Sequence, residues 1–73
     1  MEGEDKERLE TLVAPFGREV RFDEVRFESG MKLLRLTIRE GRRITMLDVD
    51  AQTALAWAEI MKRWGERESE RER

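Results

Sequence analysis

The residues of this 73-residue chain best placed to bind a cation are Asp48 and Asp50. They form an Asp-x-Asp pair, and carboxylate oxygens in such a pair can bind Mg²⁺ or Ca²⁺. No further ligand cluster is nearby in the sequence, whereas an aspartate directly before a helical segment is a common N-cap. We therefore expect Asp50 to cap a helix and Asp48 to lie at a strand end, with no metal bound.

The chain lacks the side chains on which acid–base and nucleophilic catalysis most often depend. It has no cysteine and no histidine, and its serines are Ser29, in a predicted turn, and Ser69, in a charged tail. Its glycines, at positions 3, 17, 30, 41 and 65, form no phosphate-binding loop. We therefore expect a protein that is not an enzyme and that needs no cofactor and no small-molecule substrate.

Arginines concentrate in the middle of the chain, where a basic strand face could follow a phosphate backbone. Residues 18–43 carry eight bases and five acids, although the whole chain has a net charge of −2. Because acids alternate with these bases, a solvated outer face of an ordinary sheet is the favoured interpretation, and single-stranded nucleic-acid binding is the alternative. The candidate nucleic-acid face consists of Arg21, Arg26, Arg35, Arg39, Arg42 and Arg43.

The length of the chain predicts one domain, residues 1–73, with a marginal core of its own. A domain this small buries only about 60% of its unfolded surface, and without cysteine it has no disulfide to stabilise it. Association with a second copy or a larger partner is the obvious further source of stability. No apolar run approaches the about 20 residues of a membrane span, and the acidic N-terminus lacks signal-peptide features, so we expect a cytoplasmic location.

Four segments have the periodicity of regular structure. Leu9, Leu12 and Val13 follow helical spacing, which predicts a short helix over Asp5–Ala14 that Pro15 ends. Segments rich in β-branched and aromatic or leucine residues predict three strands, at 18–28, 31–39 and 44–49, with a turn at Ser29-Gly30. Residues 1–8 and 66–73 are predicted to be frayed or disordered.

In both strands of the hairpin formed by the second and third strands, the alternation of apolar and polar residues is interrupted. The apolar residues change from odd to even positions in the first of these strands and from even to odd positions in the other. A three-residue loop, Arg39-Glu40-Gly41, would pair Leu36 with Ile44 and Lys32 with Asp48. In that register the apolar residues change from one face of the sheet to the other at one level. Such a sheet requires cover on both faces.

The last segment, Ala51 to Trp64, predicts a helix that begins after Asp50 and ends at Gly65. Its apolar stripe is wider than the about 100° of a single packing face. Trp57 and Trp64 lie seven residues apart on one side, where they pack on the sheet or enter an intermolecular contact. The candidate protein interface consists of Trp57, Ile60, Met61, Trp64, Met31, Leu33 and Leu47.

Two resemblances accompany these patterns. "ITMLDVDAQTALAW" running into a helix resembles PC4-type coactivator domains, which implies a small dimeric protein that binds single-stranded DNA, although the basic and aromatic binding positions of that family have no clear equivalents here. "PFGREV", "ESGMKLLRLTIREGRR" and "LDVDAQTA" are similar to small uncharacterised proteobacterial proteins of unknown function, and that likeness implies no activity.

The expected fold class is α+β. It combines a short N-terminal helix, a three-stranded antiparallel β-meander and a C-terminal helix packed on the sheet. The expected function is a non-catalytic protein-interaction module, either homodimeric or an accessory subunit of a larger assembly. Single-stranded nucleic-acid binding through the basic sheet face is the alternative, and no membrane partner is expected.

Overall fold

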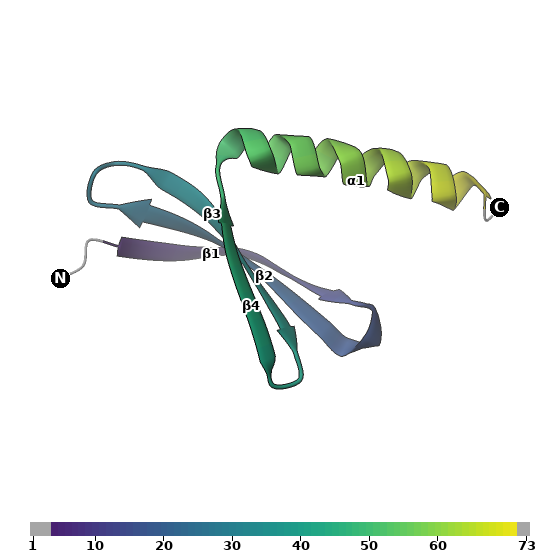
Figure 1. The fold of residues 1–73 in the computed structure, drawn as a ribbon, viewed down its shortest axis with the longest axis horizontal. Coiled ribbons are helices and arrows are strands. Elements are labelled where there is room, and N and C mark those ends of the chain that lie inside the picture. The colour runs from purple at the N-terminus through teal and green to yellow at the C-terminus, as the bar shows by residue number, and fades with distance from the viewer. Residues whose placement is uncertain (1–3, 72–73) are drawn as a thin grey trace.

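A computed structural model describes residues 4–71 as a four-stranded antiparallel sheet followed by one helix (Figure 1). The strands lie side by side in chain order, and a 3-10 turn, η1 (Pro15–Gly17), joins the first two. The α+β class is confirmed, but the sheet has four strands where three were predicted. The elements are β1 (Glu4–Ala14), β2 (Arg18–Phe27), β3 (Lys32–Glu40), β4 (Arg43–Val49) and α1 (Ala51–Arg71).

The predicted N-terminal helix is wrong, because this segment is strand β1 and pairs with β2 along its length. The register shifts between Arg8 and Glu10, which leaves Leu9 as an extra residue in a β-bulge. The bulge brings Leu9 to the same face as Leu12, three residues later, and this spacing resembles a helical repeat. A helix of this length is marginal without packing, whereas the strand gains a full ladder of hydrogen bonds.

The turns confirm one sequence prediction and correct another. Between β2 and β3 the Gly30 N–H donates to the Phe27 carbonyl at 2.9 Å, as expected for the predicted turn. Between β3 and β4 the loop is only Gly41-Arg42, because Glu40 pairs with Arg43. Gly41 has a φ of 61° and Arg42 has no positive φ, which is the pattern of a type II′ turn that suits the twist of a hairpin.

The shorter turn changes the register, so the predicted three-residue loop and its strand pairs are wrong. Leu36 lies opposite Leu47, and Asp48 lies opposite Arg35 instead of Lys32. The predicted change of apolar face is therefore not found along this hairpin. One face, here called the apolar face, carries Glu10, Glu24, Arg26 and Lys32 together with a set of apolar residues, which are Leu9, Leu12, Val20, Phe22, Leu34, Leu36, Ile38, Leu47 and Val49.

The opposite face, here called the ionic face, is tied together by arginine–carboxylate pairs. Arg35 donates from Nε and Nη2 to the two carboxylate oxygens of Asp48 at 2.8 and 2.9 Å, and its Nη2 lies 3.2 Å from Glu4. Arg8 binds Asp23, which is buried, at 2.7 Å. The hydrogen bonds from Arg35 lower the pKa of Asp48, since they favour its charged form.

Helix α1 begins as predicted and ends later. The Thr53 N–H donates to Asp50 Oδ1 at 2.8 Å, which confirms the N-cap. Hydrogen bonding by the Thr53 side chain, and then by its backbone N–H, lowers the pKa of Asp50. Gly65 does not end the helix, because the charged segment after it continues as helix to Arg71. Residues 66–71 and 4–8, predicted to be frayed, are thus helix and strand, and the other residues of that prediction, 1–3 and 72–73, lie outside the described part.

The predicted packing of the helix on the sheet is largely absent. Figure 1 shows α1 leaving the end of β4 and running away from the sheet, so that only its first turns lie against the strands. Within residues 4–71, Val25 and Val49 are the only buried apolar residues. The apolar face and the apolar stripe of the helix therefore remain exposed over much of their area.

We expect Arg35→Gln to lower the free energy of unfolding by about 1–3 kcal/mol, because it breaks a charge-assisted pair and leaves Asp48 without its partner. Urea unfolding at fixed protein concentration measures this loss. The pKa of Asp48 is lowered in the folded state, so its ionised carboxylate stabilises the folded protein above pH about 4. This stabilisation is lost as the pH falls further. At low pH the free energies of unfolding of the unaltered protein and of Arg35→Gln should therefore become more similar.

The matched control is Arg39→Gln, four residues along the same strand, where the side chain makes only a 3.5 Å contact with the Gly41 carbonyl. It should change stability by less than about 0.5 kcal/mol. Equal losses in the two variants would contradict the structural role given to Arg35.

Candidate functional site

An apolar groove lies between α1 and the apolar face of the sheet. It has a volume of about 390 Å³, and every residue that lines it is apolar. The sheet supplies one wall and residues 54–61 of the helix supply the other. The lining residues are Phe22, Leu34, Leu36, Val49, Ala54, Leu55, Trp57, Ala58 and Met61.

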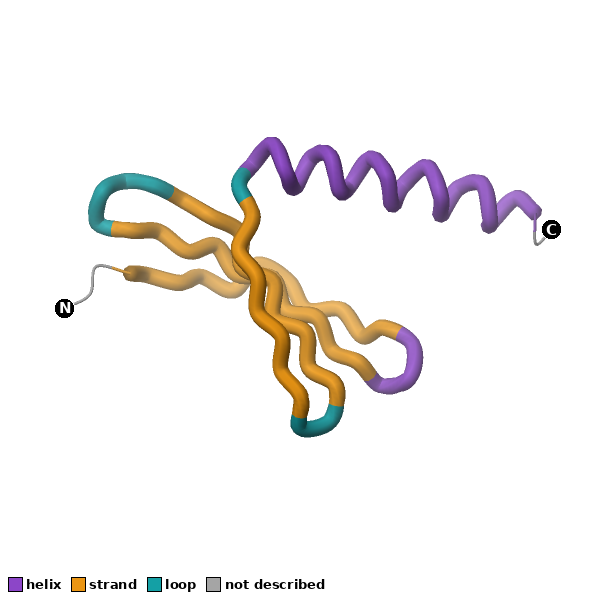
Figure 2. Tube along the Cα trace, in the orientation of Figure 1, coloured by secondary structure: helices purple, strands orange, loops and turns teal. Residues whose placement is uncertain are grey.

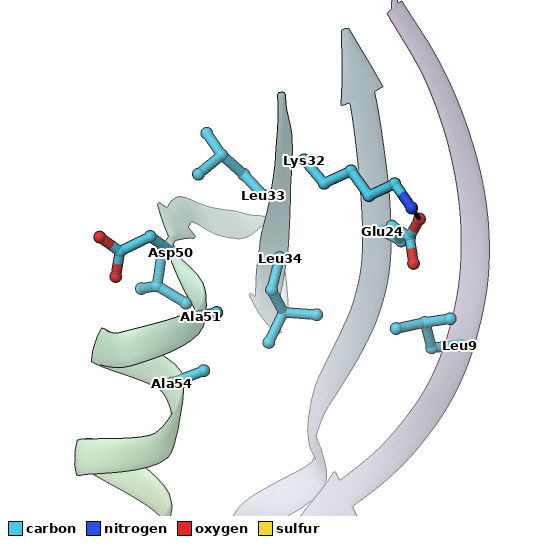
Figure 3. Close-up of a pocket in the computed structure, with 9 residues that line it drawn as sticks. Leu9, Glu24, Lys32, Leu33, Leu34, Asp50, Ala51 and Ala54 are labelled. Carbon is cyan, nitrogen blue, oxygen red and sulfur yellow. Dashed lines mark ion pairs between the residues drawn. The ribbon is translucent and has the colours of Figure 1, made fainter. Parts of the chain in front are cut away.

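A smaller pocket of about 170 Å³ continues the groove toward the start of the helix, and the two share Leu34, Val49 and Ala54. Figure 3 shows Leu9 of β1 and Leu34 of β3 extending toward each other beside the first turns of α1. The ion pair of Lys32 and Glu24, 3.9 Å apart, borders this pocket. The small side chains Ala51 and Ala54 in the first turns of α1 allow the helix to approach the sheet here. The space between helix and sheet widens toward the C-terminal end of the helix.

The amount of exposed surface is too large for a folded chain of this mass. The chain exposes 6258 Å², whereas a compact monomer of 8.7 kDa exposes about 4,700 Å². The excess is about 1,500 Å² per chain by the same scaling. Large apolar side chains on the helix wall of the groove contribute to it, among them Leu55 and Met61, which are 72% and 69% exposed.

The dimensions of the molecule agree with that excess. The Cα radius of gyration is 14.9 Å, against about 11 Å for a compact domain of 73 residues. The molecule measures 52 × 30 × 16 Å. Both values reflect a helix that extends away from its sheet, as Figure 1 shows.

The structure brings together only part of the predicted protein interface. Trp57 and Met61 line the groove, and Leu47 lies on the apolar face beside Leu36. Ile60 and Trp64 lie on an adjacent side of the helix, together with Arg63 and Arg67. The two remaining candidates are elsewhere: Met31 follows the β2–β3 turn, and Leu33 pairs with Val25 on the ionic face.

Sequence reasoning missed the sheet half of the groove. Phe22, Leu34, Leu36 and Val49 line it, and the register of the hairpin determines which face they share. The spacing of Leu34, Leu36 and Ile38 was a usable signal, because three alternate leucine or isoleucine residues in a strand indicate one apolar face.

The candidate nucleic-acid arginines do not form one surface. Arg21, Arg35 and Arg39 point to the ionic face, whereas Arg26 lies on the other side of the sheet. Arg26 binds Glu7 at 3.0 Å and Glu24 at 2.9 Å, and these bonds raise the pKa of its guanidinium. Arg21 lies 3.3 Å from Glu19.

Arg39 lies near the β3–β4 turn together with the two remaining candidates, Arg42 and Arg43. Arg39, Arg42 and Arg43 form no ion pair with a carboxylate of residues 4–71. Figure 2 shows this turn at the same end of the sheet as the β1–β2 connection, and the ion pair of Arg18 and Glu40 links the two.

That end of the sheet also carries Phe16, an aromatic residue that sequence reasoning did not select. Its side chain is 91% exposed, and the Arg18 guanidinium lies 5.5 Å from the centre of its ring. Its φ of 66° lies in the left-handed region, which bulky residues rarely adopt. An exposed aromatic ring held in a strained turn is a candidate contact residue.

Within residues 4–71 there is no group of three or more side chains that could hold a metal ion. Over the same residues, no helix is both long and apolar enough to cross a membrane.

Comparison with known proteins gives one match. The model described as "Family of unknown function (DUF6967)" matches residues 3–67. No curated protein and no solved structure matches the chain. These comparisons do not show the resemblance to PC4-type domains or a proteobacterial origin.

We expect Phe16→Asn to raise the free energy of unfolding by up to about 1 kcal/mol, because asparagine tolerates the left-handed conformation that costs other residues about 1–2 kcal/mol. The lost contact with Arg18 offsets part of this gain. Phe16→Ala, which keeps the strain and loses the ring, is the matched control and should be the less stable variant. If urea unfolding shows Phe16→Asn to be destabilised by more than about 1 kcal/mol, the ring supports the fold and is not a free contact residue.

Proposed function

We propose that this chain, which belongs to the family of unknown function DUF6967, is a non-catalytic protein-interaction module that works as a homodimer. The observation that carries the proposal is the open apolar groove between α1 and the sheet. A surface of this kind is stable in water only when another apolar surface covers it.

The size of the uncovered surface supports a permanent partner. An excess of about 1,500 Å² per chain corresponds to about 3,000 Å² for two chains, which lies within the about 2,000–5,000 Å² of obligate homodimer interfaces. Transient contacts bury less and are more polar. Trp57 and Met61 supply the large side chains that anchor such interfaces.

A second copy also satisfies the requirement that both partners be apolar at the contact. Each chain carries an uncovered sheet face and an uncovered helix stripe, so two copies related by a two-fold axis can cover both at once. The interaction module can also be an accessory subunit of a larger assembly, and a homodimer of this chain can fill that role.

We expect Ala58→Glu to dissociate the homodimer, because it places a charge among the apolar residues of the groove. Sedimentation velocity should show the unaltered protein at twice 8.7 kDa and the variant at the mass of one chain, with a dissociation constant raised at least a hundredfold.

Ala56→Glu is the matched control. It is the same substitution two residues away, about 160° around the helix from Ala58, and Ala56 does not line the groove. This variant should remain dimeric. If both variants or neither of them dissociate, the groove is not the dimer contact.

Single-stranded nucleic-acid binding remains a second candidate function because of the end of the sheet that carries Phe16. Arg39, Arg42 and Arg43 are not neutralised by carboxylates of residues 4–71, and an exposed ring lies at the same end. Basic side chains beside an exposed aromatic are the combination that single-strand binders use.

We expect, on this second candidate, that the double variant Arg39→Glu, Arg42→Glu weakens binding of a labelled oligothymidine at least tenfold. The negative slope of log K against the logarithm of the salt concentration should become shallower by about 1.4, since each lost phosphate contact contributes about 0.7 on single strands. Fluorescence anisotropy measures both. Arg67→Glu with Arg71→Glu, far along the helix, changes the charge equally and should leave binding unchanged; equal effects, or no binding by the unaltered protein, would eliminate this candidate.

A further inference from the structure

We infer that the occupant of the apolar groove is helix α1 of the second copy, so that each helix lies across the sheet of its partner. The inference rests on the homodimer proposed above and specifies how its two chains are joined. It follows from the connection between β4 and α1, from the dimensions of the helix and from the width of its apolar stripe.

The connection between sheet and helix is a single residue. Strand β4 ends at Val49 and α1 begins at Ala51, so only Asp50 lies between them. Asp50 is also fixed as the cap, because Oδ1 accepts from the Thr53 N–H at 2.8 Å and its carbonyl accepts from the Ala54 N–H at 3.0 Å. A link this short and this constrained sets the direction of the helix and does not let it fold back onto its own sheet. Short connections of this kind favour the exchange of an element between protomers.

The helix has the length that such an exchange requires. Its apolar residues lie between positions 51 and 64, a stretch of about 20 Å at 1.5 Å per residue. Four strands spaced about 4.8 Å apart make a sheet about 14 Å wide between its outer strands. The apolar part of one helix is therefore long enough to cross the full width of the sheet, and the charged residues 66–71 would extend past its edge.

The apolar stripe is wide enough for two surfaces. Ala54, Ala58 and Met61 face the groove of their own chain. Ile60 and Trp64 lie further around the helix and do not line that groove. When the partner's helix enters the groove it meets this chain's sheet on one side and this chain's helix on the other, and the two-fold axis repeats both contacts.

The groove contains nothing that would oppose an apolar occupant. Each of its lining residues is apolar, and the ion pair of Lys32 and Glu24 lies at the edge of the neighbouring pocket. On the helix segment that would enter, Arg63 lies beside Ile60 and Trp64, and its Nε is 3.7 Å from the Glu59 carboxylate, so its charge is paired. The pairing thus buries no unpaired charge at its centre.

The experiment uses two single-cysteine proteins, since the chain has no cysteine of its own. Trp64→Cys marks the side of the helix that does not face its own groove, and Leu36→Cys marks the floor of the groove. The two proteins are mixed, unfolded, refolded together and oxidised, and a disulfide between them can form only between different chains. We expect a mixed dimer on a non-reducing gel, in at least tenfold excess over the mixture of Glu59→Cys with Leu36→Cys, since Glu59 lies on the polar side of the helix.

Sedimentation velocity of the same mixtures under reducing conditions tests the homodimer separately from the exchange of helices. Dimers that form no mixed disulfide would overturn the exchange of helices and leave the homodimer in place. Monomers throughout would overturn both. If circular dichroism shows that either protein does not fold, the pair Ile60→Cys and Phe22→Cys tests the same contact, and its failure to cross-link in a dimer overturns the inference equally.

Discussion

The one-residue connection between β4 and α1 determines how much of its apolar surface the chain can cover. Asp50 ends the strand, caps the helix and leaves no further residue that could redirect it. As a result α1 touches the sheet with its first turns only, and the rest of the apolar face lies open. The extended shape, the large exposed area and the groove all follow from this constraint.

The ionic face supplies the second constraint, because it fixes the register on which the apolar face depends. The Arg35–Asp48 pair forms only when β3 and β4 are joined by a two-residue turn. In the same register Leu34 and Leu36 lie beside Val49 and Leu47 on the opposite side. Charged residues in this chain therefore have unequal roles: Arg8 and Arg35 hold the sheet together, and Arg39, Arg42 and Arg43 remain at its exposed end.

Much of the fold could be predicted from the sequence, and the errors have identifiable physical causes. The helix start at Asp50, the turn at Gly30 and strands β2 to β4 follow from local signals, which depend on neighbouring residues alone. The spacing of apolar residues in β1 predicts a helix because the bulge at Leu9 alters the alternation that a regular strand has. The groove could be predicted only in part, since its sheet wall depends on a turn one residue shorter than expected and its opening depends on the direction of α1.

The claim at the centre of this account is that a second copy completes the core of each chain, and unfolding of the unaltered protein tests it most directly. If folding and association are one process, the urea midpoint must rise with protein concentration. Over a hundredfold range the account predicts a gain of about 2.7 kcal/mol per dimer, the value of RT ln 100. A midpoint that stays constant over that range would show that one chain is stable alone and would contradict the account.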